Sequence, residues 1–205
     1  MKAIAVNADY SLSAEEQKTP VPGPNEILIK VQCAGVNRAD LMQRRGLYPP
    51  PPGASKILGL ECSGIVESVG RNCERFRGGD SVCALLSGGG YAEYVAVDEG
   101  SVLPMPAGFS FEQAASIPEV FATAWLNLFD KGELKKNSNV LIHAGASGVG
   151  TAATQLCRVY ESRPWVTVGS QFKLKKCMEL GAVDGAVRTA ADFWDRVRSF
   201  PIRSR

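Results

Sequence analysis

Histidine is almost absent from this sequence, since His143 is the only one among 205 residues. A metal site or an acid/base site built from several histidines is therefore excluded within this chain. Long apolar runs are also missing, and none approaches the roughly 20 residues that a membrane helix needs. The first 16 residues lack the apolar core of a signal peptide, because polar residues interrupt them from Asn7 onward. These absences predict a cytoplasmic protein that does not associate with membranes.

An excess of charge of either sign is missing too. The 23 Lys and Arg residues nearly balance the 21 Asp and Glu residues, and a net charge of +2 does not indicate a nucleic-acid partner. The six cysteines form no C-x-x-C pair, and their irregular spacing without a secretory signal predicts reduced thiols. With 45% hydrophobic and 21% charged residues, the composition is that of a globular protein of one or two domains.

Short strands separated by turns dominate the chain up to about residue 115. Alternating side chains and β-forming residues mark the candidate strands, and Gly- or Pro-rich turns separate them. The predicted strands are 2–6, 26–36, 63–69, 81–86 and 90–97. This pattern predicts a compact, barrel-like β domain.

Strands and helices alternate in the rest of the chain. After two helical segments at 111–117 and 120–129, strands are predicted at 140–143, 165–168 and 183–187. Helices are predicted at 149–160, from a Ser170 cap through Leu180, and from Thr189 through Val197. This β-α-β-α-β-α order is typical of a doubly wound parallel sheet, so the fold class is α/β with a preceding β domain.

The turn after the first of these strands carries the pattern G-x-x-G-x-G, formed by Gly145, Gly148 and Gly150. A tight turn at the start of a helix lets the backbone, including Ser147 and Val149, approach a dinucleotide pyrophosphate. The spacing differs from the usual G-x-G-x-x-G, and a plain strand-to-helix turn is the alternative. A serine nucleophile elbow, G-x-S-x-G, is a weaker alternative because residue 149 is valine.

The end of the next strand bears on the choice between NAD and NADP. No acidic residue follows Val168, whereas Gly169, Ser170 and Lys173 do. A hydroxyl and a lysine suit a ribose 2′-phosphate, so NADPH is favoured over NADH. The alternative, a solvated lysine face of a helix, suits Lys175 and Lys176 well and competes evenly at Ser170 and Lys173.

Several further segments give the chain a family likeness. They are N-R-A-D-L-M-Q-R-R-G at 37–46, Y-P-P-P at 48–51, L-G-L-E at 58–61 with Gly64, I-P-E at 117–119, the turn at 143–150 and V-T-V-G-S at 166–170. Over residues 1 to about 193 the chain resembles the zinc-independent quinone oxidoreductases, the zeta-crystallin-like branch of the medium-chain dehydrogenase/reductases. Within that branch it most resembles the tumour-suppressor-inducible subgroup.

The resemblance implies a GroES-like catalytic domain at residues 1–115 and a Rossmann domain that binds NADP at 116–205. It implies hydride transfer from NADPH to a quinone. Zinc-using relatives hold their metal with a Cys and with the Glu and His of a G-H-E motif. Asn37 and the sequence Gly59-Leu60-Glu61 stand at those places here, so we expect no bound metal.

The resemblance also implies roles for individual residues. Asn37 and Tyr48 are expected to face the nicotinamide and the substrate, with Tyr48 orienting and polarising rather than acting as an acid. Apart from the resemblance, Tyr48 reads more simply as a turn aromatic packed on the prolines that follow it. Thr123 is expected to contact the nicotinamide side. Arg188 stands where the family usually has a Tyr or His, and it either pairs with the 2′-phosphate or marks a divergent tail.

The chain is much shorter than the family pattern, which continues for well over a hundred residues. Only the adenosine half of a Rossmann sheet is expected, so its first strand should be an open edge and turnover by this chain alone should be weak or absent. The alternative to an enzyme is a non-catalytic, truncated form that binds cofactor or pairs with another subunit as a homo- or hetero-oligomer.

Overall fold

The structure, a computed structural model, describes residues 1–200. Contacts divide the chain into two compact units, Met1–Glu119 and Val120–Arg205. Each unit has its own hydrophobic core.

The first unit is built on a five-stranded antiparallel sheet with the strand order β6-β3-β4-β5-β7. These strands are β3 (Glu26–Ala34), β4 (Glu61–Val69), β5 (Ser81–Leu85), β6 (Tyr94–Asp98) and β7 (Val102–Pro104). Ile27 and Ile29 are fully buried and Lys30 is exposed, as the alternating pattern predicts, but Leu28, expected on the same face as Lys30, is buried as well. Val66 and Val82 meet them in the same core. The predicted β domain is therefore confirmed.

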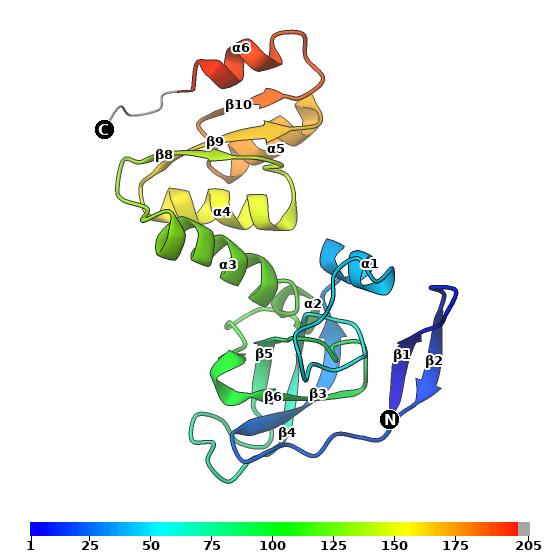
Figure 1. Cartoon of the computed structure of the whole chain (residues 1–205). Helices are drawn as coiled ribbons and strands as arrows, with labels where there is room; N and C mark the ends of the chain where they lie inside the picture. The colour runs from blue at the N-terminus through cyan, green and yellow to red at the C-terminus, as the bar shows by residue number, and fades with distance from the viewer. Residues whose placement is uncertain (201–205) are drawn as a thin grey trace. The chain divides into compact units, whose positions relative to one another are not determined.

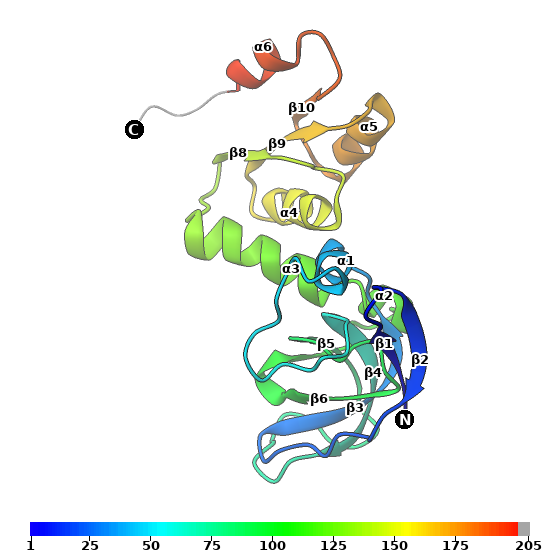
Figure 2. The same ribbon diagram turned by 45° about the vertical axis from the view of Figure 1, so that its right-hand side comes forward.

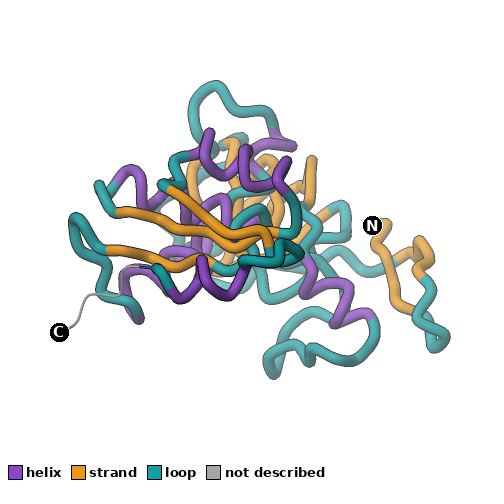
Figure 3. The backbone as a smooth tube through the Cα atoms, turned by 90° about the horizontal axis from the view of Figure 1, so that it is seen from above, coloured by secondary structure: helices purple, strands orange, loops and turns teal. Residues whose placement is uncertain are grey.

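Two strands and three short helices complete this unit. The hairpin of β1 (Lys2–Val6) and β2 (Leu12–Glu16) is a separate antiparallel ribbon at the N-terminus (Figure 3). The helices are α1 (Arg38–Arg44), the 3₁₀ turn η1 (Glu99–Ser101) and α2 (Phe111–Ala114). Neither β2 nor α1 is predicted from sequence, because β2 is mostly polar and α1 has only seven residues. The strand predicted from Gly90 begins only at Tyr94.

The second unit contains a parallel sheet of three strands in the order β10-β9-β8. They are β8 (Asn139–Ile142), β9 (Arg163–Val168) and β10 (Asp184–Val187). The helices are α3 (Pro118–Trp125), which begins in the first unit, then α4 (Gly148–Val159), α5 (Gln171–Leu180) and α6 (Phe193–Arg198). Helices α4 and α6 lie on opposite faces of the sheet (Figures 1 and 2). The predicted α/β class is confirmed.

Local details differ from the sequence predictions. The helix predicted over 120–129 is α3 followed by a π-helical segment, η2 (Leu126–Lys131). Pro164 lies inside β9, where we expected it to precede the strand. The last helix begins at Phe193, because Ala190 N bonds back to Val187 O and residues 189–192 form a turn. No helix among residues 1–200 is both long enough and apolar enough to span a membrane.

Candidate functional site

A pocket of about 650 Å³ opens beside the carboxyl ends of β8 and β9 in the second unit. Ligands of open parallel sheets bind at this end of the strands. The pocket brings together residues from the turn after β8, the end of β9, α5, the segment after β10 and α6. Its lining consists of His143, Ala144, Ala146, Ser147, Thr167, Val168, Gly169, Lys173, Arg188, Phe193 and Trp194.

The turn after β8 presents the start of α4 to this pocket. Ser147 is the N-cap, and its Oγ accepts a hydrogen bond from Gly150 N at 3.1 Å. The N–H groups of Gly148 and Val149 are the first two of the helix, so they have no acceptor within it. Ala144 adopts a left-handed backbone with φ of 55°, a costly conformation for a residue other than glycine. Free N–H groups at a helix start can bind an anionic ligand.

The three glycines of this turn are required by the packing of the protein itself. A methyl group on Gly145 would lie 2.6 Å from Val166 Cβ, and one on Gly148 would lie 2.9 Å from Val120 Cγ1. A methyl group on Gly150 would lie 2.5 Å from Ala144 O. Each of these distances is shorter than real Cβ contacts allow. The glycines therefore let β9, α3 and the turn pack closely, in addition to any ligand contact.

The glycine at the end of β9 differs from those of the turn in having no close protein neighbour. A methyl group on Gly169 would have no atom within 4 Å, so this glycine borders open space. Ser170 caps α5 through a 3.3 Å hydrogen bond from Lys173 N, and its side chain is not part of the pocket lining. Lys173 and Arg188 do line the pocket, and neither forms an ion pair with any residue from 1 to 200.

The serine-nucleophile alternative finds no base in this geometry. The Ser147 hydroxyl is engaged as a helix cap. His143 Nδ1 lies 3.0 Å from Thr167 Oγ1, on the neighbouring strand. A serine nucleophile needs a base within hydrogen-bond reach, and His143 is oriented by Thr167 instead. Within residues 1–200, the position of His143 thus gives no support to the serine-nucleophile alternative.

Sequence reasoning did not single out two aromatic residues of the pocket. Phe193 and Trp194 begin α6, and their ring centroids are 5.1 Å apart in an edge-to-face arrangement. Trp194 is 65% exposed. They begin the helix that follows the third strand of the sheet, and this position was the available signal, because loops and helix starts at that edge line the site.

Asn37 belongs to a buried polar cluster in the first unit. It is the N-cap of α1, and its Nδ2 donates to Glu61 Oε1 at 2.8 Å. Its backbone N–H donates to Asp40 Oδ2 at 2.7 Å, and the hydroxyl of Tyr91 donates to the same oxygen at 2.9 Å. Asp40 Oδ1 is buried without a hydrogen-bond partner among residues 1–200. Two buried carboxyl groups thus fix the position of Asn37.

Both oxygens of Glu61 accept hydrogen bonds from the protein. Oε2 accepts from Glu119 N at 2.9 Å, in the first turn of α3, while Oε1 accepts from Asn37. Burial raises the pKa of Glu61 above its ordinary value, although these two hydrogen bonds act in the opposite direction. Burial and the hydrogen bond to Asp40 raise the pKa of Tyr91 as well. A methyl group on Gly35 would lie 2.2 Å from Glu61 Oε1, so the Glu61 side chain fills that space.

Tyr48 lies apart from this cluster on a second pocket, of about 530 Å³, within the first unit. Its side chain is 48% exposed and shares the lining with Gln43, Pro50, Pro51, Leu60, Leu86 and Glu119, among others. Pro50 and Pro51 are near Tyr48 as the simpler alternative expected, but the ring also borders a cavity. Asn37 does not line this pocket, and Thr123 on α3 does not line the pocket of the second unit.

Within residues 1–200, no three His, Cys, Asp or Glu side chains are placed to hold a metal ion together. All six cysteines are free thiols, and Cys62, Cys83, Cys157 and Cys177 are buried.

Comparisons with known proteins agree with this architecture. Residues 23–107 match the alcohol dehydrogenase GroES-like domain. A synaptic vesicle membrane protein VAT-1 homolog from Danio rerio is 43% identical over 139 residues, covering 68% of this chain and 29% of the relative. A solved NAD-dependent alcohol dehydrogenase has a TM-score of 0.85 at 32% identity, covering 97% of this chain and 66% of its own. The Escherichia coli quinone oxidoreductase complexed with NADPH has a TM-score of 0.82 at 30% identity, covering 96% and 60%. The chain spans about half, or less, of the length of the curated relatives it matches.

Proposed function

We propose that this chain, which belongs to the medium-chain dehydrogenase/reductase family, binds NADPH and serves the zinc-independent reduction of a quinone. The observation that carries the proposal is the pocket of the second unit, where Lys173 and Arg188 line the same space as Ser147, the N-cap of α4. When bound, the nicotinamide cofactor supplies a hydride. The solved relative with NADPH is a quinone oxidoreductase, which supports both the cofactor and the substrate class.

The pocket favours NADPH over NADH through its charges. Its lining contains two cationic side chains, from Lys173 and Arg188, and no Asp or Glu. An NAD site places a carboxylate at the end of the second strand to accept hydrogen bonds from the ribose 2′-hydroxyl, whereas a 2′-phosphate needs cations. In our proposal Gly169 and Ser170 admit the ribose, and Gly145, Ser147, Gly148, Val149 and Gly150 hold the pyrophosphate at the helix start.

A metal-free reaction is supported by the surroundings of Glu61. The residue at the place of the relatives' Cys ligand is Asn37, whose amide donates to Glu61 instead of binding a metal. The other carboxylate oxygen accepts from Glu119 N. Each oxygen of Glu61 thus has a hydrogen-bond partner within the protein. We therefore assign Glu61 a role in holding Asn37.

Tyr48, Asn37 and Thr123 are proposed to serve the nicotinamide and the quinone. Asn37 Nδ2 donates to Glu61, which fixes the orientation of the amide. An amide oxygen has two lone pairs, so Oδ1 can accept from a ligand such as the nicotinamide carboxamide in addition to capping α1. The exposed Tyr48 phenol can donate to a quinone oxygen. The likeness to the tumour-suppressor-inducible subgroup stays part of this proposal.

A second function, binding without turnover, is favoured by one observation. Within residues 1–200, β8 pairs only with β9, so its other side is an open sheet edge that another strand can join. A chain that binds cofactor or pairs with another subunit through this edge would bind NADPH and 2′-phospho-ADP-ribose equally well and show no quinone reduction. Tighter binding of NADPH, with turnover, would support the enzyme.

The 2′-phosphate role is tested with Lys173→Glu. We expect this variant to lose affinity for NADPH by about 10-fold or more while NADH binding changes little, because only NADPH carries the extra phosphate. Lys175→Glu is the matched control, since Lys175 is exposed on the same helix and does not line the pocket. Equal losses for both cofactors, or an equal effect of Lys175→Glu, would contradict the assignment. Calorimetric titration of each cofactor gives the readout.

A further inference from the structure

The first residues of α6 form an aromatic wall of the pocket in the second unit. Phe193 and Trp194 line the same space as Lys173 and Arg188. Trp194 is 65% exposed, and Phe193 packs edge-to-face against it at 5.1 Å. Phe193 thus supports the indole ring from one side, while much of the indole stays accessible.

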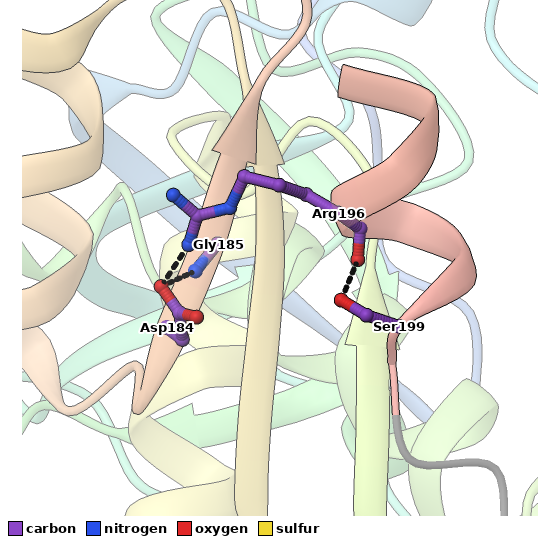
Figure 4. Close-up of polar contacts among 4 residues, drawn as sticks. All are labelled: Asp184, Gly185, Arg196 and Ser199. Atoms are coloured by element: carbon purple, nitrogen blue, oxygen red, sulfur yellow. Dashed lines mark hydrogen bonds and ion pairs between the residues drawn. The ribbon is translucent and has the colours of Figure 1, made fainter. Parts of the chain in front are cut away.

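The helix that carries this wall is fastened to the sheet. Arg196 Nη2 on α6 lies 2.6 Å from Asp184 Oδ1 at the start of β10, and Gly185 N donates to the same oxygen at 2.7 Å (Figure 4). Ser199 Oγ donates to Arg196 O at the end of the helix. Arg188 N donates to Val168 O, which fixes the start of the segment that leads to α6. The indole is therefore placed by contacts on both sides of the turn.

The chemistry of the pocket identifies its ligand class. Lys173 and Arg188 form no ion pair among residues 1–200, so an anionic ligand would complement their charges. A large exposed aromatic ring beside them suits a flat ring system, because stacking removes apolar surface from water on both partners. A phosphorylated nucleotide supplies the phosphate and the planar base in one molecule.

We propose that Trp194 stacks on the adenine ring of the 2′-phosphorylated adenine nucleotide that this pocket binds. This inference rests on the proposed function, because it takes NADPH as the ligand of the pocket. Trp194 contacts the base while Lys173 and Arg188 contact the phosphate. The last described helix is then part of the cofactor site.

Tryptophan fluorescence tests the inference directly. The chain has three tryptophans, and Trp165 is buried while Trp125 lies on α3, outside the pocket lining. Adenosine 2′,5′-bisphosphate is the probe, because it lacks nicotinamide and cannot quench by energy transfer to the reduced ring. We expect it to quench the emission of the wild type and of Trp125→Phe, and not that of Trp194→Phe.

Affinity gives a second readout. Loss of base–aromatic stacking in Trp194→Ala should weaken adenosine 2′,5′-bisphosphate by about 5- to 100-fold, and Trp194→Phe should restore most of it. Ribose 5-phosphate, which has no base, should bind all variants alike. Unchanged affinity in a folded Trp194→Ala overturns the stacking role and leaves the proposed function intact. Absence of binding of the bisphosphate to the wild type overturns both.

Discussion

Replacing Asn37 with Asp changes one atom of the buried cluster and places a third carboxyl group in it. The new oxygen would stand where Nδ2 stands, 2.8 Å from Glu61 Oε1. Two carboxylates at this separation, or about 4 Å apart when their charge is spread over both oxygens, repel by about 4 to 6 kcal/mol at an effective dielectric constant of 20. Such a pair keeps one proton at neutral pH instead of ionising fully.

The retained proton makes the stability of the variant depend on pH. Above pH 5 the unfolded chain releases the protons of both carboxyl groups, whereas the folded pair holds one. The folded state then binds about one proton more, so the free energy of unfolding falls by about 1.4 kcal/mol per pH unit relative to the wild type. The loss begins above the ordinary carboxyl pKa of about 4 and continues until the raised pKa of the pair is passed.

Urea unfolding at pH 5.5, 6.5 and 7.5 measures this slope. Asn37→Ala should lose about 1 to 3 kcal/mol through the orphaned Glu61 oxygen, with a slope much shallower than that of Asn37→Asp. Asn25→Asp is a surface control, because Asn25 is exposed and Asp keeps the oxygen that accepts from Asn72 Nδ2. If Asn37→Asp has the same pH slope as Asn25→Asp, residue 37 does not lie against Glu61 as described.

Three further predictions concern the turn and the thiols. Gly150→Ala should lower the free energy of unfolding by about 1 to 3 kcal/mol, because the new methyl group clashes with Ala144 O. Gly169→Ala should change the free energy of unfolding by less than about 0.5 kcal/mol, because no atom lies within 4 Å of the new methyl group. Similar losses for the two variants in thermal unfolding would refute this difference. Ser147→Ala should cost about 1 kcal/mol because the hydrogen bond to Gly150 N is lost, and a stability equal to the wild type would show that the cap is not formed in solution. Burial raises the pKa of Cys62 to about 12 and that of Cys157 to about 11. A disulfide reagent at pH 8 should therefore label only Cys33 and Cys73 quickly, since the other four thiols are buried. Rapid labelling of more than two thiols in the folded protein would contradict the buried positions.

The sequence predicts the alternation of strands and helices in the second unit because its signals are local. Ser170 caps α5, and Gly181 ends this helix with a φ of 120°. Serine is a favoured residue at the start of a helix and glycine at its end, so both boundaries can be predicted from the sequence. The pattern Asn37 to Asp40 is a capping signature of α1, yet the helix is too short to show an apolar period. Strand β2 is missed for a related reason, since a hairpin ribbon with little buried surface needs no alternation.

The candidate site was predictable where one short segment builds it. Gly169, Lys173 and Arg188 meet at one pocket because parallel strands end at a common edge. The contact of Asn37 with Glu61 joins residues 24 positions apart, and Tyr91 lies 51 positions from Asp40. Such pairings depend on the register of β4 and the turns around it, which local patterns do not specify. Trp194 was passed over because its segment was taken to lie outside the family pattern.

The packing of the glycine turn has a consequence for how related sequences are interpreted. Gly145, Gly148 and Gly150 are held by neighbouring protein atoms, so a descendant that no longer bound nucleotide would still be under selection to keep them. Gly169 has no such neighbour, and mutation could fill that space freely once the ligand was gone. In distant homologues, a retained G-x-x-G-x-G pattern therefore indicates that the packing around this turn is retained. Substitutions at residues 169, 173 and 188 are the better indication that a homologue no longer binds the cofactor.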